Sequence, residues 1–134
     1  MFGALDISTS GLVAQRTRLN VIAANIANKD TLLDAEGRYE PYRRRIAMLS
    51  AGDPTRGTPD GVQVLEIALD DAPLRLKHEP SSPYADADGY VAYPNVDGVV
   101  EQMNAMEAAR SYEANITAIE ATKSMMSIAL EMLG

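Results

Sequence analysis

The last third of the chain runs from Val99 to Leu133 without a glycine or a proline. Apolar side chains recur in it at steps of mostly three or four residues, at Val99, Met103, Met106, Ala109, Tyr112, Ile116, Ile119, Met126, Leu130 and Leu133. This spacing is typical of a stripe along an α-helix. Asp97 is the expected N-cap and Gly134 the expected C-terminal cap. The segment therefore predicts one helix of roughly 55 Å, at about 1.5 Å per residue.

A second helix is expected from Leu5 to Asn28. Its apolar residues recur every seven positions, with one more between the last two: Leu5, Leu12, Leu19, Ile22 and Ile26. Such a stripe packs along one seam against another helix. We expect the cap at its start among Ser8, Thr9 and Ser10, and its end at Asn25 or Asn28. Gly11 near the start costs about 1 kcal/mol of helix propensity relative to alanine.

The region between these helices contains all seven prolines, which excludes long helices there. Residues 41–49, 61–69 and 90–93 alternate between apolar and polar side chains, as half-buried strands do. The alternation slips at Leu65, which predicts a β-bulge. We expect a small antiparallel sheet joined by polar loops.

Together these patterns predict an α+β fold in three parts: a helix in residues 1–30, a small β-rich region in 31–95, and the long helix in 96–134. The two terminal helices are expected to pair as an antiparallel coiled coil. Because the second helix is longer by roughly 20 Å, part of its apolar stripe lacks a partner in the same chain. Burial of four such side chains supplies on the order of 6–12 kcal/mol before ordering costs, so we expect another chain to cover them.

The sequence predicts no catalytic, cofactor-binding or metal site. The stretch YADADGYVAYPN at 84–95 lacks the first and last carboxylates of an EF-hand calcium loop, so we expect a turn followed by a strand. His78 is the single histidine, and one histidine with scattered acids makes no ligand set. There is no cysteine and no GxSxG motif, and Asp86 and Asp88 form no acid pair suited to cleaving cell-wall polymer. Arg43, Arg44 and Arg45 alternate in direction along a strand, which favours salt bridges over an anion site.

Charge and hydropathy exclude further classes of partner. The net charge of −7 argues against binding to nucleic acid, and no apolar run is long enough to span a membrane. Residues 1–30 carry three basic and two acidic side chains, whereas residues 95–134 carry two and six, which weakly favours contact between the two ends. The first residues lack the apolar run of a cleavable signal peptide. We therefore expect a cytoplasmic protein or one exported by a route that needs no such peptide.

Five of the seven methionines lie in the last helix, at Met103, Met106, Met125, Met126 and Met132. Met125 and Met126 are adjacent, so they project about 100° apart and cannot share one narrow seam. Flexible thioether side chains suit surfaces that fit several non-identical neighbours. The pattern is equally compatible with such a surface and with ordinary core packing.

Two segments resemble a known family. ALDISTSGLVAQRTRLNVIAANIAN at 4–28 resembles the N-terminal signature of bacterial flagellar rod, hook and related axial proteins. Residues 86–133, which begin DADGYVAYPNVD and include RSYEAN, resemble the C-terminal region of the proximal-rod members of that family. PYRRR at 41–45 and the order of the three parts are similar as well. The segment NKDTLLDAEGRYE at 28–40 departs from the threonine- and asparagine-rich segment that is usual in the family.

The resemblance implies a structural, non-enzymatic subunit of the proximal rod, in the periplasmic part of the flagellar basal body. Such subunits pair their terminal helices and stack into a tube that transmits torque and encloses the export channel, with the middle region facing outward. The implied partners are further copies, other rod proteins, export-gate proteins and the type III export apparatus. An export-linked adaptor or cap that binds one axial partner without polymerising is the alternative. We expect the assembly interface to consist of Leu5, Leu12, Leu19, Ile22, Ile26, Met106, Ile116, Ile119, Met126, Leu130 and Leu133.

Overall fold

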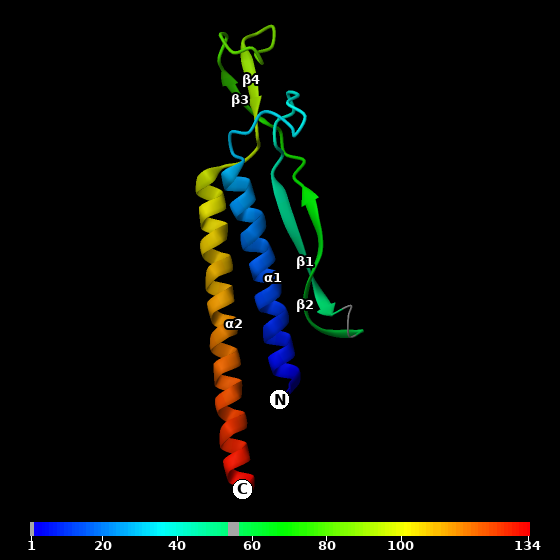
Figure 1. The fold of residues 1–134 in the computed structure, drawn as a ribbon, viewed down its shortest axis with the longest axis vertical. Helices are drawn as coiled ribbons and strands as arrows, with labels where there is room; N and C mark the ends of the chain where they lie inside the picture. The colour runs from blue at the N-terminus through cyan, green and yellow to red at the C-terminus, as the bar shows by residue number, and fades with distance from the viewer. Residues whose placement is uncertain (1, 54–56) are drawn as a thin grey trace.

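The computed structural model describes residues 2–53 and 57–134. Helix α1 (Phe2–Ala27) and helix α2 (Gly98–Leu133) stand at the two ends of the chain. Between them lie four strands: β1 (Arg45–Asp53), β2 (Thr58–Leu69), β3 (Arg75–His78) and β4 (Tyr90–Tyr93). In Figure 1, α2, α1 and the β1–β2 hairpin lie side by side with α1 in the middle, and the β3–β4 sheet projects beyond the helices. The predicted α+β class is confirmed, with two long helices in contact and antiparallel strands between them.

Helix α1 begins earlier than the sequence suggests, so the predicted cap at Ser8, Thr9 or Ser10 is wrong. These residues lie inside the helix, where Ser10 has a different role. Its hydroxyl donates to the Ile7 carbonyl oxygen at 2.6 Å and accepts from the Val62 N–H at 3.1 Å. Ser10 therefore tethers α1 to β2.

The other helix ends agree with the sequence. At the end of α1, the backbone N–H and the side-chain amide of Asn28 both donate to the Ala24 carbonyl oxygen, at 3.0 and 2.8 Å. At the start of α2, the Asp97 carboxylate accepts from the N–H groups of the second and third helical residues. Gly134 donates its N–H to the Leu130 carbonyl oxygen and closes the helix. The predicted caps Asp97, Gly134 and Asn28 are confirmed.

The strands form two separate two-stranded sheets, where the sequence predicts one. In the β1–β2 hairpin, Met48 lies opposite Glu66 and Leu49 lies opposite Val64. Leu65 is thus the additional residue of a bulge, and the predicted bulge is confirmed. Strand β3 was not expected, because all four of its side chains are exposed and carry no alternation. Its pairing with β4 holds it in place.

The two helices run antiparallel, and three facing pairs define their register. Asn25 contacts Glu101, and Arg18 contacts Glu107 at 3.4 Å. Gly11 lies against Asn115, and a Cβ at position 11 would come within 2.6 Å of the Asn115 amide nitrogen. The glycine that lowers helix propensity is thus what allows the close approach of α2.

In this register the last turns of α2, residues 125–133, extend beyond α1. Figure 1 shows this end projecting past the start of the chain. At about 1.5 Å per residue the overhang is roughly 13 Å, shorter than the predicted 20 Å because α1 begins before Leu5. We call residues 125–133 the α2 overhang.

The core is small. Its buried apolar side chains include Ala14, Val21, Ile22, Val91, Val96 and Ala108. The polar residues Asn25, Glu101 and Thr122 are buried with them. Small and polar residues therefore make up much of the contact between the helices, and many large apolar side chains of α2 remain exposed. Among the residues that the structure describes, no helix is long and apolar enough to cross a membrane.

Candidate assembly site

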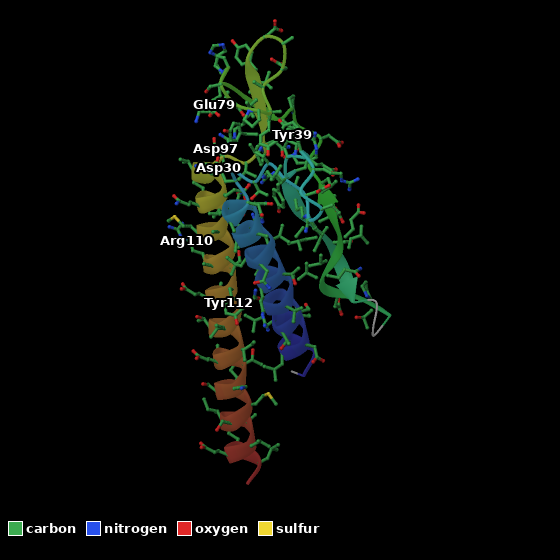
Figure 2. The ribbon with its side chains drawn as sticks, turned by 45° about the horizontal axis from the view of Figure 1, so that its top comes forward. Asp30, Tyr39, Glu79, Asp97, Arg110 and Tyr112 are labelled. Atoms are coloured by element: carbon green, nitrogen blue, oxygen red, sulfur yellow. The ribbon has the colours of Figure 1, made fainter. Side chains whose placement is uncertain are left out.

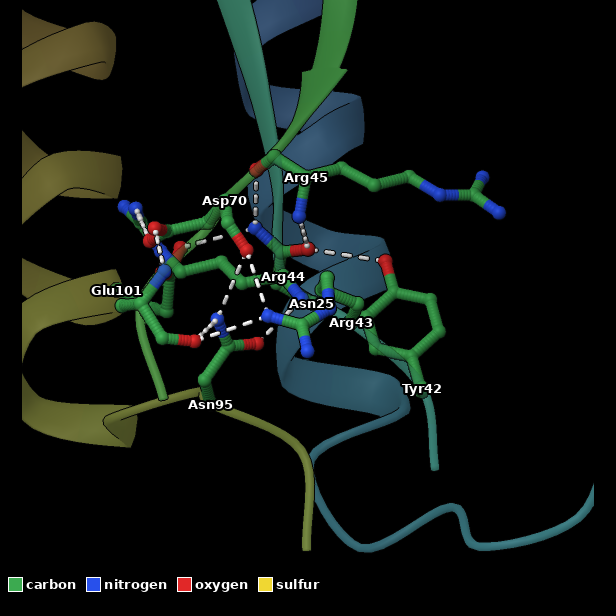
Figure 3. A network of polar contacts seen from close by, with 9 residues as sticks. Asn25, Tyr42, Arg43, Arg44, Arg45, Asp70, Asn95 and Glu101 are labelled. Carbon is green, nitrogen blue, oxygen red and sulfur yellow. Dashed lines mark hydrogen bonds and ion pairs between the residues drawn. The ribbon is translucent and has the colours of Figure 1, made fainter. Parts of the chain in front are cut away.

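A polar network joins both helices to the β1–β2 hairpin and sets the shape of the molecule (Figure 3). Asn25 of α1 is buried in its centre. Its amide nitrogen donates to the Arg45 carbonyl oxygen at 2.9 Å, and its amide oxygen accepts from the Arg45 N–H at 3.0 Å. The same oxygen accepts from the Tyr42 hydroxyl at 2.9 Å. The asparagine thus binds the first residue of β1 as a neighbouring strand would, which fixes the hairpin against α1.

Asn95, just before α2, binds the backbone of Arg44, the residue before Arg45. Its amide oxygen accepts from the Arg44 N–H at 2.7 Å. Its amide nitrogen donates to the carbonyl oxygens of Asp70 and Ala72 at 3.2 and 3.0 Å. The guanidinium of Arg43 donates to the same two carbonyl oxygens. The end of β2 and the start of β1 are therefore both attached to the chain that enters α2.

Arg44 completes the network through its side chain. The guanidinium donates to the Asp70 carboxylate at 3.0 Å and forms an ion pair with Glu101, whose side chain is 0% exposed. Burial lowers the pKa of Arg44, but the bonds to Glu101 and Asp70 outweigh it and raise the pKa above its ordinary value. The Ala72 N–H and then the Arg44 guanidinium hold the pKa of Asp70 below its ordinary value. The expectation that the arginine run forms salt bridges is confirmed at Arg44.

The sequence offers Asn25 as a possible end of α1, and this prediction is wrong: Asn25 lies inside the helix and belongs to this network. Glu101 lies in the first turn of α2, where the helix dipole favours a carboxylate, and it is also the buried ion-pair partner of Arg44. The signal in the sequence was that Glu101 lies seven residues before Ala108 and therefore on the same face of α2, which indicates a charged residue in the helix contact. Which residue would neutralise it was not readable from the sequence.

The residues of the expected assembly interface occupy several environments. On α1, Ile22 is buried, Leu5, Leu12 and Leu19 are half-buried, and Ile26 is exposed. On α2, Ile119 and Met126 are half-buried against the rest of the chain, whereas the other four are exposed: Met106, Ile116, Leu130 and Leu133. The eleven side chains therefore do not form one continuous surface.

Most of the exposed apolar residues of α2 fall into two groups. One group lies, by helix periodicity, on the face opposite the buried residues Glu101, Ala108 and Thr122, where Figure 2 shows Arg110 pointing away from α1. We call this group the outer stripe: Val99, Met103, Met106, Met125, Ile128 and Met132. The other group is Leu130 and Leu133, which follow the α1-facing side past the point where α1 ends. They are 69% and 86% exposed because α1 ends before it reaches them. The single apolar stripe assumed from the sequence thus combines two faces.

The acidic stretch at 84–95 forms a turn. The Asp86 carboxylate accepts from the N–H groups of Asp88 and Tyr90, both at 2.9 Å, and Gly89 adopts a positive φ of 83°. The carboxylate most suited to a cation is therefore occupied by backbone donors. The turn connects β3 to β4, and His78 lies exposed at the end of β3, where its ring makes a T-shaped contact with the ring of Tyr90.

The sequence is similar to known proteins along nearly its whole length. The family model described as "Flagella basal body rod protein" matches residues 5–32, and "Flagellar basal body rod FlgEFG protein C-terminal" matches residues 87–132. The chain is 39% identical to the flagellar basal-body rod protein FlgC of Bacillus subtilis, over 98% of this chain and 97% of that protein. It is 42% identical to FlgC of Salmonella typhimurium and 43% identical to FlgC of Yersinia enterocolitica, each over 94% of this chain and 92% of the relative.

The chain belongs to the FlgC family of flagellar basal-body rod proteins. It is thus a structural protein of the basal-body rod and not an enzyme. Membership of the FlgC family also implies assembly with other rod proteins. The two matched segments cover α1 and the β4–α2 unit, which are the elements that the polar network holds together.

Proposed function

We propose that this rod protein assembles through its two terminal helices, with further copies and with other rod subunits, into a tube that transmits torque and surrounds the export channel. The exposed apolar surface of α2 supports the proposal most directly. The outer stripe and the overhang place large side chains in water at both ends of a 36-residue helix. Burial of this surface against neighbours would favour association.

The surfaces left exposed lie on different flanks of the molecule, which supports an open assembly. The outer stripe of α2 faces one side, and the β1–β2 hairpin, with exposed Leu65, Ile67 and Leu69, lies on the other side of α1. Contacts between unlike surfaces propagate from copy to copy when they do not close into a ring. Two flanks of this kind suit a helical tube.

The residues proposed to carry assembly are the eleven apolar side chains named from the sequence, with the exposed members of α2 in direct contact with neighbours. Export-gate proteins are proposed partners at one end of the assembly. Passage through the flagellar type III export apparatus is the proposed route to the periplasm.

Replacement of Leu130 and Leu133 by glutamine tests the proposal. Both side chains are exposed in the single chain, so the free energy of unfolding should change by no more than about 0.5 kcal/mol. Incorporation into basal bodies, measured by immunoblotting of purified basal bodies, should fall sharply, and swimming motility with it. Glu113→Gln with Glu120→Gln, exposed polar positions on the same helix, is the matched control. Normal incorporation of the Leu130→Gln, Leu133→Gln protein would contradict the proposal.

A further inference from the structure

The outer stripe of α2 is rich in sulfur. Four of its six side chains are methionines, and they are 64%, 58%, 58% and 83% exposed: Met103, Met106, Met125 and Met132. Of the five methionines in α2, only Met126 is half-buried. Methionine is the apolar residue whose side chain a mild oxidant makes polar, because its thioether takes up one oxygen atom to form a sulfoxide. The outer stripe is therefore an apolar surface that an oxidant can convert into a polar one.

The four methionines lie on two different parts of the helix. Met103 and Met106 lie between the two positions at which polar contacts hold α2 to α1. Their exposure is thus a property of an ordered helix face. Met125 and Met132 lie in the α2 overhang, where fraying of the helix would leave them in water as well. All four side chains are therefore accessible to a small oxidant in the unassembled subunit.

We propose that the outer stripe is a site of reversible methionine oxidation, and that sulfoxides at these positions keep the subunit out of the rod. The inference rests on the proposed function, because it requires that neighbours bury the stripe. In the oxidation step, a lone pair of the sulfur attacks one oxygen of hydrogen peroxide, and a sulfur–oxygen bond forms as the oxygen–oxygen bond breaks. The sulfur loses two electrons, and the other oxygen leaves with both hydrogens as water. Two thiols of a reductase reverse the step and give the thioether, a disulfide and water.

A sulfoxide weakens the stripe as an interface. Its oxygen is a hydrogen-bond acceptor that water satisfies in the free subunit, whereas burial against an apolar neighbour leaves this oxygen without a donor. The thioether carries no such penalty, and its flexible chain adapts to neighbours of different shape. Assembly in turn removes the sulfur from solvent, so subunits already in the rod are protected. Oxidation therefore acts on subunits before they assemble.

A variant with leucine at all four positions tests the role of the sulfur: Met103→Leu, Met106→Leu, Met125→Leu, Met132→Leu. Leucine keeps the surface apolar and has a similar helix propensity, but it has no sulfur to oxidise. Cells that carry the full-length wild type or the variant receive a brief sublethal pulse of hydrogen peroxide while rods are being built. In immunoblots of purified basal bodies, incorporation of the wild type should fall by at least about threefold, and that of the leucine variant should stay unchanged.

Met48→Leu is the matched control. Met48 is an exposed methionine of β1, outside the outer stripe, so its replacement should leave incorporation as sensitive to peroxide as in the wild type. A second measurement uses the wild type alone. Peptide mass spectrometry after the pulse should find sulfoxide at the four stripe positions at least about tenfold enriched in the unassembled pool over basal bodies, because assembly excludes oxidised subunits and buries the others.

Two outcomes would overturn the inference: an equal loss of wild type and leucine variant after the pulse, or equal sulfoxide fractions in the two pools. Its failure differs from the failure of the proposed function. If the leucine variant has no advantage while Leu130→Gln, Leu133→Gln is excluded from basal bodies, the subunit assembles through α2 but its assembly is not sensitive to oxidation. If Leu130→Gln, Leu133→Gln enters basal bodies normally, the proposed function fails, whatever the response to peroxide.

Discussion

Asn25 illustrates how much a single side chain decides in this protein. It is 1% exposed, and its amide satisfies both backbone groups of Arg45 while it also contacts Tyr42 and Glu101. Only a side chain with a donor and an acceptor on one planar group fits all of these partners. Asn95 does the same for the Arg44 N–H and the end of β2. Two asparagines distant in the sequence thus hold Arg45, the first residue of β1, and Arg44 just before it.

Asn25→Asp removes the donor without changing the shape. The Arg45 carbonyl oxygen loses its partner, and a second carboxylate then faces Glu101, which lies 3.4 Å from the amide nitrogen. We expect a loss of about 3 kcal/mol in the free energy of unfolding, measured by urea titration. Asn20→Asp, exposed on the same helix, should change it by less than about 0.5 kcal/mol. Equal effects at the two positions would refute the role assigned to Asn25.

Asp70 predicts a pH dependence of stability. Its folded-state pKa is lowered by the Ala72 N–H and by Arg44, so ionised Asp70 stabilises the fold above the ordinary pKa of 3.8. That contribution is lost as the pH falls from this value toward the lowered folded-state pKa. The stability difference between wild type and Asp70→Asn should therefore be clear in urea titrations at about pH 7 and should shrink near pH 3. A difference that is independent of pH would mean that the charge of Asp70 has no such role.

At the scale of elements, the register of the α1–α2 pair is set by small and polar side chains more than by large apolar ones. Gly11 admits Asn115, whose amide nitrogen donates to the Ser111 carbonyl oxygen at 3.0 Å, and Arg18 pairs with Glu107. These contacts specify one register with little apolar burial. A helix pair of this kind is well defined in orientation but modest in stability.

Gly11→Ala tests the fit between the helices. The new Cβ would meet the Asn115 side chain at 2.6 Å, so we expect a loss of about 1 kcal/mol although alanine favours helix. In an Asn115→Ala background the same change should stabilise the protein by up to about 1 kcal/mol. Gly3→Ala, with no atom within 4 Å of the new Cβ, is the control and should be neutral or slightly stabilising. Additive effects at 11 and 115 in thermal unfolding would show that the two residues do not interact.

At the scale of the whole molecule, the protein is elongated, and its largest fully buried side chains lie toward one end. The polar network and the buried residues Val91 and Val96 lie near the start of α2, whereas the other end of α2 has no covering element. Helical structure far from the core has few tertiary contacts to stabilise it. The distal turns are therefore expected to fray in the isolated subunit.

We expect the far-UV circular dichroism of the dilute subunit to show less helix than α1 and α2 together, and to gain helix on assembly. The gain follows because neighbours would bury the outer stripe and the overhang and thereby order them. The Leu130→Gln, Leu133→Gln variant should not show this gain at the same concentration. A dilute monomer with full helix content would contradict the expectation.

The parts of the fold that were predictable are those encoded by local patterns. The absence of glycine and proline after Val99 and the cap at Asp97 located α2, and the slipped alternation located the bulge at Leu65. The sequence does not predict the short strand β3, because its four exposed residues show no alternation of apolar and polar side chains. The strand is formed by its pairing with β4. The start of α1 was predicted too late in the chain because Ser10 is a typical N-cap residue. In the structure its hydroxyl instead accepts a hydrogen bond from β2.

The sequence by itself determined that two long helices flank a small β region, because helix periodicity, capping residues and turn residues act over a few neighbouring positions. Only the tertiary structure decided which face of each helix is inward, since that depends on partners distant in the chain: Gly11 with Asn115, and Arg44 with Glu101. It also decided that the apolar residues of α2 belong to two surfaces, because α1 ends before α2 does. Periodicity shows that a helix has an apolar face. Only the packing of the other elements determines whether that face is covered.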